Sequence, residues 1–148
     1  MFWEDLSLVE MSPAQWESLC DGCARCCLHK LQDRETGAYA YTAVACELLD
    51  LSSCRCGDYA NRSRRVPDCA DLRLLMDGGE VSAFSWLPTT CAYRLLAEGQ
   101  PLPDWHHLVS GDSEAVHREG YSVRGKVLSA TDVHPDEIEE CVIQWIDT

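Results

Sequence analysis

The sequence predicts a small α+β domain, mainly α-helical, with a few short strands and irregular loops that are rich in cysteine. Three observations support this fold class. Short segments begin and end with helix signals, the segment 39–44 is rich in aromatic and β-branched residues, and nine of the ten cysteines lie between positions 20 and 91. A chain of 148 residues is long enough to bury one hydrophobic core, so we expect a single domain over 1–148.

The first clear element is a short helix that begins at Pro13 and ends near Leu19. Ser12 is a favoured N-cap residue, and proline suits the first helical position because its missing N–H would have no partner there. Glu17 lies too far along the helix to complete a capping box with Ser12. The helix therefore leads directly into Cys20.

Two short strands are expected next, over residues 28–32 and 39–44. The second contains Tyr39, Tyr41 and Val44, which favour the extended conformation. A loop between the two segments would let them pair as a hairpin.

Two further short helices are predicted between positions 69 and 98. The first covers residues 69–76 and ends at Gly78-Gly79, because glycine commonly terminates helices. The second covers residues 91–98, with Thr89 or Thr90 as its cap, and stops at Gly99.

Within this single domain we expect two parts. Residues 1–99 form a metal-binding part, for which the cysteines are discussed below, and residues 100–148 form a C-terminal appendage of a strand and a helix. Polar and apolar residues alternate over 121–128, which predicts a strand. Over residues 135–146 the apolar residues have helical periodicity, and the first turn is acidic. The tenth cysteine falls on the apolar stripe of this helix, where we expect it to be a core residue. The stripe consists of Ile138, Cys141, Val142, Trp145 and Ile146.

The charge balance limits the possible partners. With 12 basic and 25 acidic residues, the net charge is −13 and no basic run could neutralise phosphates, so we expect no nucleic acid ligand. No stretch of about 18 apolar residues occurs, and the N-terminus lacks the features of a secretory signal. We therefore expect a cytoplasmic protein that does not bind membranes, in which cysteines serve as metal ligands or core residues rather than in disulfides.

The most informative motif is the cysteine loop of residues 20–27, with the spacing C-x2-C-x2-C-C. Two intervening residues allow the chain to turn so that successive sulfurs face one centre, and such turns direct backbone N–H groups at the sulfurs. Asp21-Gly22 supplies the reversal, since glycine readily adopts a positive φ. The adjacent side chains of Cys26 and Cys27 diverge, so either one of them packs in the core or they serve two neighbouring centres.

The remaining cysteines of this region have no helical or strand periodicity to organise them, so a metal is the obvious organiser. Nine thiols suit two four-thiolate sites with one cysteine left over, or one cluster plus one zinc, and their number favours two centres slightly over one. Thiolates bind zinc and iron–sulfur clusters alike, and the spacing C-x2-C-x2-C of the first three cysteines favours a cluster slightly. The candidate ligands are Cys20, Cys23, Cys26, Cys27, Cys46, Cys54, Cys56, Cys69 and Cys91.

The histidines give weaker signals. His29 follows the cysteine loop and is a candidate ligand or hydrogen-bond donor to one. His106-His107 could reach a metal, but a pair beside Trp105 more often stabilises a loop through hydrogen bonds.

Several motifs in order along the chain resemble the bacterial YcgN-like cysteine-cluster family, within the broader YkgJ-type group of zinc- or iron-chelating proteins. The resemblance extends from Trp16 to at least Arg124 and implies a bacterial cytosolic metalloprotein, with the nine cysteines from Cys20 to Cys91 as its ligands. Cys141 lies outside the pattern. The matching segments are 16–28, 54–59, 67–69, 86–96 and 102–106.

Three functions are compatible with these features. The first is a thiolate metal protein that carries an iron–sulfur cluster or zinc, with a role in redox chemistry, metal handling or sensing. The second is an iron–sulfur-dependent enzyme in which Trp105, His106 and His107 line a substrate pocket. The third is a structural zinc module that docks a protein partner. The sequence identifies no catalytic residue, no substrate and no protein partner.

Overall fold

The computed structural model describes residues 1–148, with the side chain of Val81 excepted. The chain divides into two compact units, and each is built from separate stretches of sequence. Unit 1 is helical and contains residues 1–22, 70–121 and 148, whereas unit 2 contains residues 23–69 and 122–147 and holds all the strands. The predicted α+β class is confirmed. The predicted division at residues 99 and 100 does not coincide with these units, and the single domain over 1–148 stays a prediction.

Helix α2 (Pro13–Ser18) of unit 1 forms where the sequence predicts it. The hydroxyl of Ser12 accepts a hydrogen bond from the backbone N–H of Gln15 (3.2 Å), and the Gln15 side chain accepts one from the N–H of Ser12 (2.9 Å). A capping box is therefore present, with Gln15 in the role for which Glu17 is too distant. This reciprocal pair satisfies two N–H groups that the helix itself leaves without partners.

Helices α4 (Leu72–Asp77) and α5 (Ala92–Ala97) match the other two predicted helices of unit 1. The carboxylate of Asp71 caps α4 by accepting from the N–H groups of Arg73 (3.0 Å) and Leu74 (3.2 Å). Helix α5 begins one residue later than predicted, so that Cys91 is its N-cap residue in place of a threonine. Gly99 follows this helix with φ +70°, as its predicted role as a helix stop requires.

The core of unit 1 is organised around the ring of Trp16, which is buried. The Tyr93 ring lies 4.7 Å from it, and the Tyr93 hydroxyl donates to the Trp16 carbonyl at 2.8 Å. The guanidinium of Arg73 lies 4.8 Å from the same ring and donates to the carbonyl oxygens of Leu8 and Met11. These contacts join α2, α4 and α5 to the N-terminal segment. The remaining helices of unit 1 are α1 (Phe2–Asp5), η1 (Leu8–Glu10), η4 (Val81–Phe84), α6 (His107–Ser110) and α7 (Ala115–Arg118).

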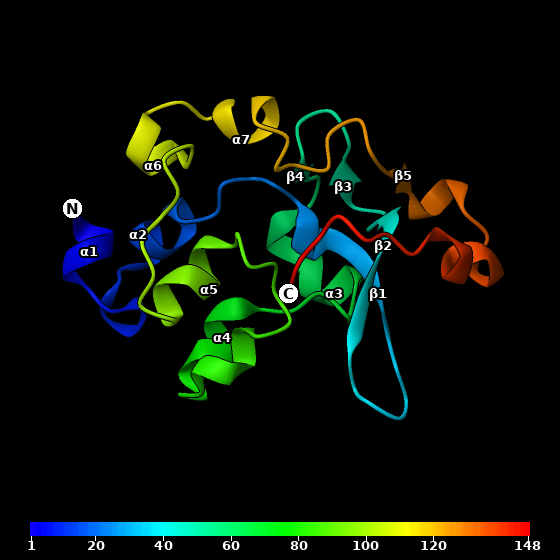
Figure 1. Cartoon of the computed structure of the whole chain (residues 1–148), viewed down its shortest axis with the longest axis horizontal. Coiled ribbons are helices and arrows are strands. Elements are labelled where there is room, and N and C mark those ends of the chain that lie inside the picture. The colour runs from blue at the N-terminus through cyan, green and yellow to red at the C-terminus, as the bar shows by residue number, and fades with distance from the viewer. The chain divides into compact units, whose positions relative to one another are not determined.

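Unit 2 is built on the predicted hairpin, which Figure 1 shows as a long two-stranded ribbon in cyan. Strands β1 (Leu28–Gln32) and β2 (Tyr39–Ala45) are antiparallel, with Lys30 opposite Tyr41 and an irregularity in register between that pair and the pair formed by Leu28 and Ala45. Strand β5 (Leu128–Ser129) pairs in parallel with the other edge of β2. The central strand is therefore β2.

A second, two-stranded sheet of unit 2 consists of β3 (Leu49–Asp50) and β4 (Arg55–Cys56). The carboxylate of Asp50 accepts from the N–H groups of Ser52 and Ser53 at 2.9 Å each, which closes the turn between the strands. Cys54 ends this turn with φ +58°. The helices that follow or precede these strands are η2 (Arg25–Cys27), η3 (Tyr59–Asn61), α3 (Arg62–Arg65), η5 (Ala130–Asp132) and η6 (Pro135–Cys141).

Two predictions for the C-terminal part are wrong. The strand predicted over 121–128 is limited to β5, and the helix predicted over 135–146 is the 3-10 helix η6, which ends at Cys141. Val142 is extended and forms a bridge with Thr42, so pairing with the edge of β2 replaces the last helical turn. Cys141 is consequently half-buried, contrary to its predicted place in the core.

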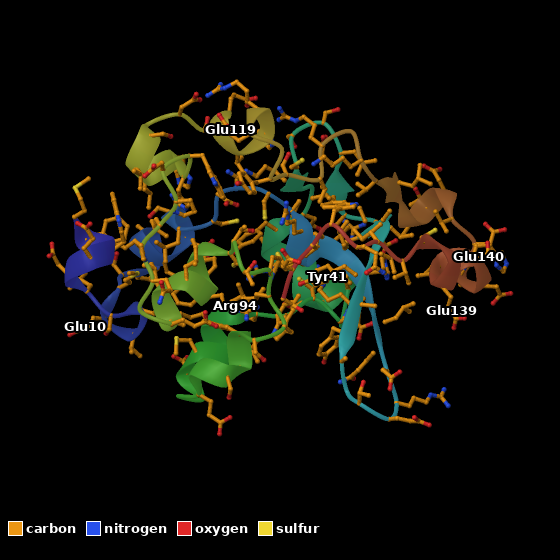
Figure 2. All side chains as sticks on the ribbon, in the orientation of Figure 1. Glu10, Tyr41, Arg94, Glu119, Glu139 and Glu140 are labelled. Atoms are coloured by element: carbon orange, nitrogen blue, oxygen red, sulfur yellow. The ribbon has the colours of Figure 1, made fainter. Side chains whose placement is uncertain are left out.

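The acidic residues of η6 are exposed to solvent. Figure 2 shows Glu139 and Glu140 pointing away from the strands. Among the described residues, no helix has the length and apolar character that crossing a lipid bilayer requires.

Candidate metal centre

The candidate cysteines are unequally distributed between the two units. Cys20 and Cys91 belong to unit 1, and the other seven belong to unit 2. All ten cysteines of the chain are reduced thiols in the structure. The seven in unit 2 are Cys23, Cys26, Cys27, Cys46, Cys54, Cys56 and Cys69.

The cysteine loop has the geometry that its spacing predicts. Gly22 has φ +78° and Ala24 has φ +60°, so the chain turns through two left-handed residues before η2 begins. This turn directs the backbone N–H of Arg25 at the sulfur of Cys23, 3.5 Å away. An N–H group in this position stabilises a thiolate, which is the form of cysteine that binds metals.

Cys46 is brought to the same end of the hairpin as the cysteine loop. It directly follows β2, and its N–H donates to the carbonyl oxygen of Cys27 at 2.9 Å. The residue before β1 and the residue after β2 are therefore hydrogen-bonded neighbours. Antiparallel pairing of the strands produces this proximity, although the two cysteines are far apart in sequence.

Cys69 provides the clearest link between thiols of different segments. Burial raises the pKa of its half-buried thiol, and Arg62 acts in the opposite direction. The charges of Cys26, Cys46 and Cys56 raise this pKa further, as neighbouring thiolates would. The cysteine loop, the end of β2, strand β4 and the segment before α4 thus each contribute a thiol to one electrostatic neighbourhood.

A lysine that the sequence analysis does not single out lies among these thiols. Lys30 is half-buried on β1, and this burial holds the pKa of its ammonium below the ordinary value. The charges of Cys26, Cys27, Cys69 and Cys46 oppose this shift. Lys30 falls on the strand predicted over residues 28–32, but its place beside the cysteine loop depends on the irregular pairing of that strand with β2, which the sequence does not reveal.

Cys54 occupies a different environment from the other candidates. Only 3% of its surface is exposed, and it packs in an apolar cluster. Burial raises the pKa of its thiol, with Arg124 and Ser122 acting in the opposite direction. An apolar surrounding favours the neutral thiol, so Cys54 behaves as a small core residue. The other buried members of the cluster are Ala24, Leu28, Tyr41, Ala45, Leu49 and Val123.

The thiol groups, as they lie in the structure, are not arranged as a complete metal site. Across the described side chains, no three Cys, His, Asp or Glu groups converge closely enough to hold an ion. The donor chemistry nevertheless fits a thiophilic metal, because several thiols share one neighbourhood with an N–H donor and two cationic side chains, Arg62 and Lys30. Binding would require the side chains to rotate toward one another, and such coupling of metal binding to local ordering is common in small metalloproteins.

The histidine pair is engaged with the backbone of unit 1. The Nε2 atom of His106 lies 2.9 Å from the Leu19 carbonyl oxygen, and that of His107 lies 2.7 Å from the Ser18 carbonyl oxygen. The expected role of the pair in hydrogen bonding is therefore confirmed. Trp105 stacks on Tyr121 with ring centroids 4.4 Å apart. His29 is exposed on β1.

Comparison with known proteins agrees with these features. The family model described as "CxxCxxCC: Putative zinc- or iron-chelating domain" matches residues 19–92. A UPF0260 protein of Azotobacter vinelandii is 55% identical over 142 residues, which cover 96% of this chain and 93% of that protein. UPF0260 proteins of Ectopseudomonas mendocina and Rhodopseudomonas palustris are each 52% identical, over 96% and 97% of this chain and 93% and 83% of their own lengths. No solved structure matches the chain.

Proposed function

The chain belongs to the UPF0260 family and carries its CxxCxxCC domain, and from this premise we propose that it is a thiolate metal-binding protein. The family description limits the metal to zinc or iron. We propose that the bound group is an iron–sulfur cluster, with zinc as the alternative, because the spacing C-x2-C-x2-C in the loop is used by iron–sulfur proteins. The reducing cytoplasm is the compartment in which such thiols stay available as ligands.

One observation carries the proposal, namely that the cysteine loop and the end of β2 meet, where the N–H of Cys46 donates to the carbonyl oxygen of Cys27 at 2.9 Å. The charges of Cys26, Cys46 and Cys56, which raise the pKa of Cys69, support it. Four segments of unit 2 each supply one of these thiols, and four thiolates are the number that a closed zinc or cluster site uses. We therefore assign these four as the principal ligands of one centre in unit 2. Cys20, Cys23, Cys27 and Cys91 are secondary candidates. The burial of Cys54 among apolar residues supports a core role for this cysteine instead.

The residues around the thiols have separable tasks. The N–H of Arg25 favours the thiolate of Cys23, and the guanidinium of Arg62 favours that of Cys69. The hydrogen bond from Cys46 to Cys27 holds two thiol-bearing segments together before any ion is bound. A bound zinc would add cross-links between the segments, whereas an iron–sulfur cluster would add one-electron redox chemistry. We propose that the protein uses the bound metal in redox chemistry, metal handling or sensing, and the identity of the metal determines which of these roles it has.

Purification without oxygen tests this function directly. The visible spectrum of the protein should be recorded, and iron, zinc and acid-labile sulfide should be quantified per chain. A brown protein with iron and sulfide supports the cluster, and a colourless protein with stoichiometric zinc supports the zinc alternative. A chain that retains neither metal, and that binds neither after reconstitution under reducing conditions, would contradict the proposal.

A further inference from the structure

Lys30 occupies an unusual position for a lysine. It lies opposite the buried Tyr41 across the hairpin, and its ammonium nitrogen is 5.1 Å from the centre of the Tyr41 ring, which Figure 2 labels on β2. Burial of an ammonium group is unfavourable unless hydrogen bonds and opposite charge compensate it. The surroundings of Lys30 must therefore supply both.

The hydrogen bonds come from the start of the hairpin. The Nζ atom of Lys30 donates to the carbonyl oxygen of Cys26 at 2.7 Å and to that of Leu28 at 2.8 Å. These two bonds fix the backbone on either side of Cys27. Lys30 thus fastens the end of the cysteine loop to the first strand.

The opposite charge can come from the thiol-bearing segment that Lys30 contacts, because its Nζ atom donates to the backbone of Cys26 and the adjacent Cys27 is hydrogen-bonded to Cys46. Four cysteines, Cys26, Cys27, Cys46 and Cys69, act on its charge, and three of them are among the principal ligands proposed above. A divalent ion held by four thiolates leaves the centre with a net charge of −2, since four single negative charges exceed the charge of the ion. One half-buried ammonium group beside the centre would neutralise part of that excess.

We propose that Lys30 is the built-in counter-charge of the thiolate centre, a positioning residue that anchors the cysteine loop and strengthens metal binding through its positive charge. The inference rests on the proposed function and adds a residue that is not itself a ligand. A protonated ammonium group has no lone pair with which to coordinate an ion, so Lys30 acts through its charge and through the backbone of Cys26, to which it donates.

Two substitutions separate the charge of Lys30 from its hydrogen bonds. Lys30→Gln removes the charge but keeps N–H groups that can donate to carbonyl oxygens, whereas Lys30→Arg keeps the charge. Lys126→Gln is the matched control, because Lys126 is also in unit 2 but is exposed and lies 5.1 Å over the Trp145 ring. The probe is Co²⁺ added to the reduced, metal-free protein, with zinc competition to obtain affinities and the cobalt absorption bands to report the number of thiolate ligands.

We expect Lys30→Gln to bind Co²⁺ and Zn²⁺ about 10- to 100-fold more weakly with unchanged cobalt bands. Lys30→Arg should retain most of the affinity, and Lys126→Gln should retain all of it. Far-UV circular dichroism of each metal-free variant verifies that the fold is intact. Equal affinity of Lys30→Gln and the wild type would overturn the inference, as would equal losses in the Gln and Arg variants. Failure of the wild type to bind either metal would overturn this inference and the zinc alternative, whereas the cluster proposal is decided separately by the iron and sulfide content of the protein.

Discussion

The imidazole of His106 is hydrogen-bonded to the carbonyl oxygen of Leu19, 2.9 Å away, and to the N–H of Leu108. Because Nδ1 accepts from Leu108 at 3.1 Å, the ring proton must be on Nε2, which donates to Leu19. The ring is completely buried. A second proton would remove the acceptor that Leu108 needs, so the folded protein favours the neutral form.

This arrangement predicts a pH dependence of stability. Burial lowers the pKa of His106 below its ordinary value, with the charge of His107 acting in the same direction. The unfolded chain therefore binds a proton more readily than the folded one, and the stability present above about pH 6.5 is lost as the pH falls toward the lower pKa of the folded state. Urea unfolding between about pH 8 and pH 5 should show a weaker dependence on pH in His106→Gln than in the wild type. The exposed His134 supplies the control substitution His134→Gln, and identical slopes for all three proteins would contradict the assignment.

Tyr93→Phe should destabilise the protein by about 1–2 kcal/mol, because it leaves the buried carbonyl of Trp16 without the 2.8 Å hydrogen bond from the phenol. The rings of Tyr93 and Trp16 can remain in contact, so the loss comes from the hydrogen bond alone. Chemical denaturation at neutral pH measures the change. Tyr39→Phe is the control on an exposed tyrosine, and a loss as large as that of Tyr93→Phe would speak against the hydrogen bond as the cause.

Cys69→Ser should abolish stoichiometric metal binding or reduce the affinity by at least tenfold, since it removes a thiol that interacts with three other proposed ligands. Cys141→Ser should leave the metal content unchanged, because this cysteine lies on η6 outside the thiol neighbourhood. Elemental analysis of both variants, purified without oxygen, measures the outcome. The assignment of ligands would be wrong if Cys141→Ser lost the metal and Cys69→Ser kept it.

Cys54→Ala tests whether Cys54 is a core residue or a metal ligand. Removal of one buried sulfur from the apolar cluster should lower the free energy of unfolding by about 1 kcal/mol while the metal content stays at the wild-type level. Metal analysis and urea unfolding of the same preparation give both quantities. Loss of metal from this variant would return Cys54 to the ligand set.

The parts of the fold that the sequence predicts are those with local signals. The cap at Ser12, the stop at Gly99 and the strand-forming residues of β2 act within a few positions of themselves, and the structure contains the corresponding elements. The helical periodicity of residues 135–146 is equally local, yet the extended Val142 bridges Thr42 in the hairpin. Pairing with a strand edge that is distant in sequence overrides the helical preference, and periodicity cannot reveal it.

The candidate site shows the same limit. The spacing of the loop predicts both its turn at Gly22 and the N–H directed at Cys23, because these features involve only adjacent residues. The buried position of Cys54 and the lysine among the thiols depend on how separate segments pack. Composition therefore identifies the thiols, whereas three-dimensional structure is needed to distinguish one in the core from those whose charge acts on Lys30.

The parallel pairing of β5 with β2 has a consequence for biosynthesis. Val44 leaves the ribosome about 80 residues before its partner Leu128 does. At translation rates of about 5–20 residues per second, β1 and β2 are synthesised on the order of ten seconds before β5. Until then the edge of β2 at Val44 and Ala45 has no strand partner, so the three-stranded sheet is completed only after the C-terminal segment has been synthesised.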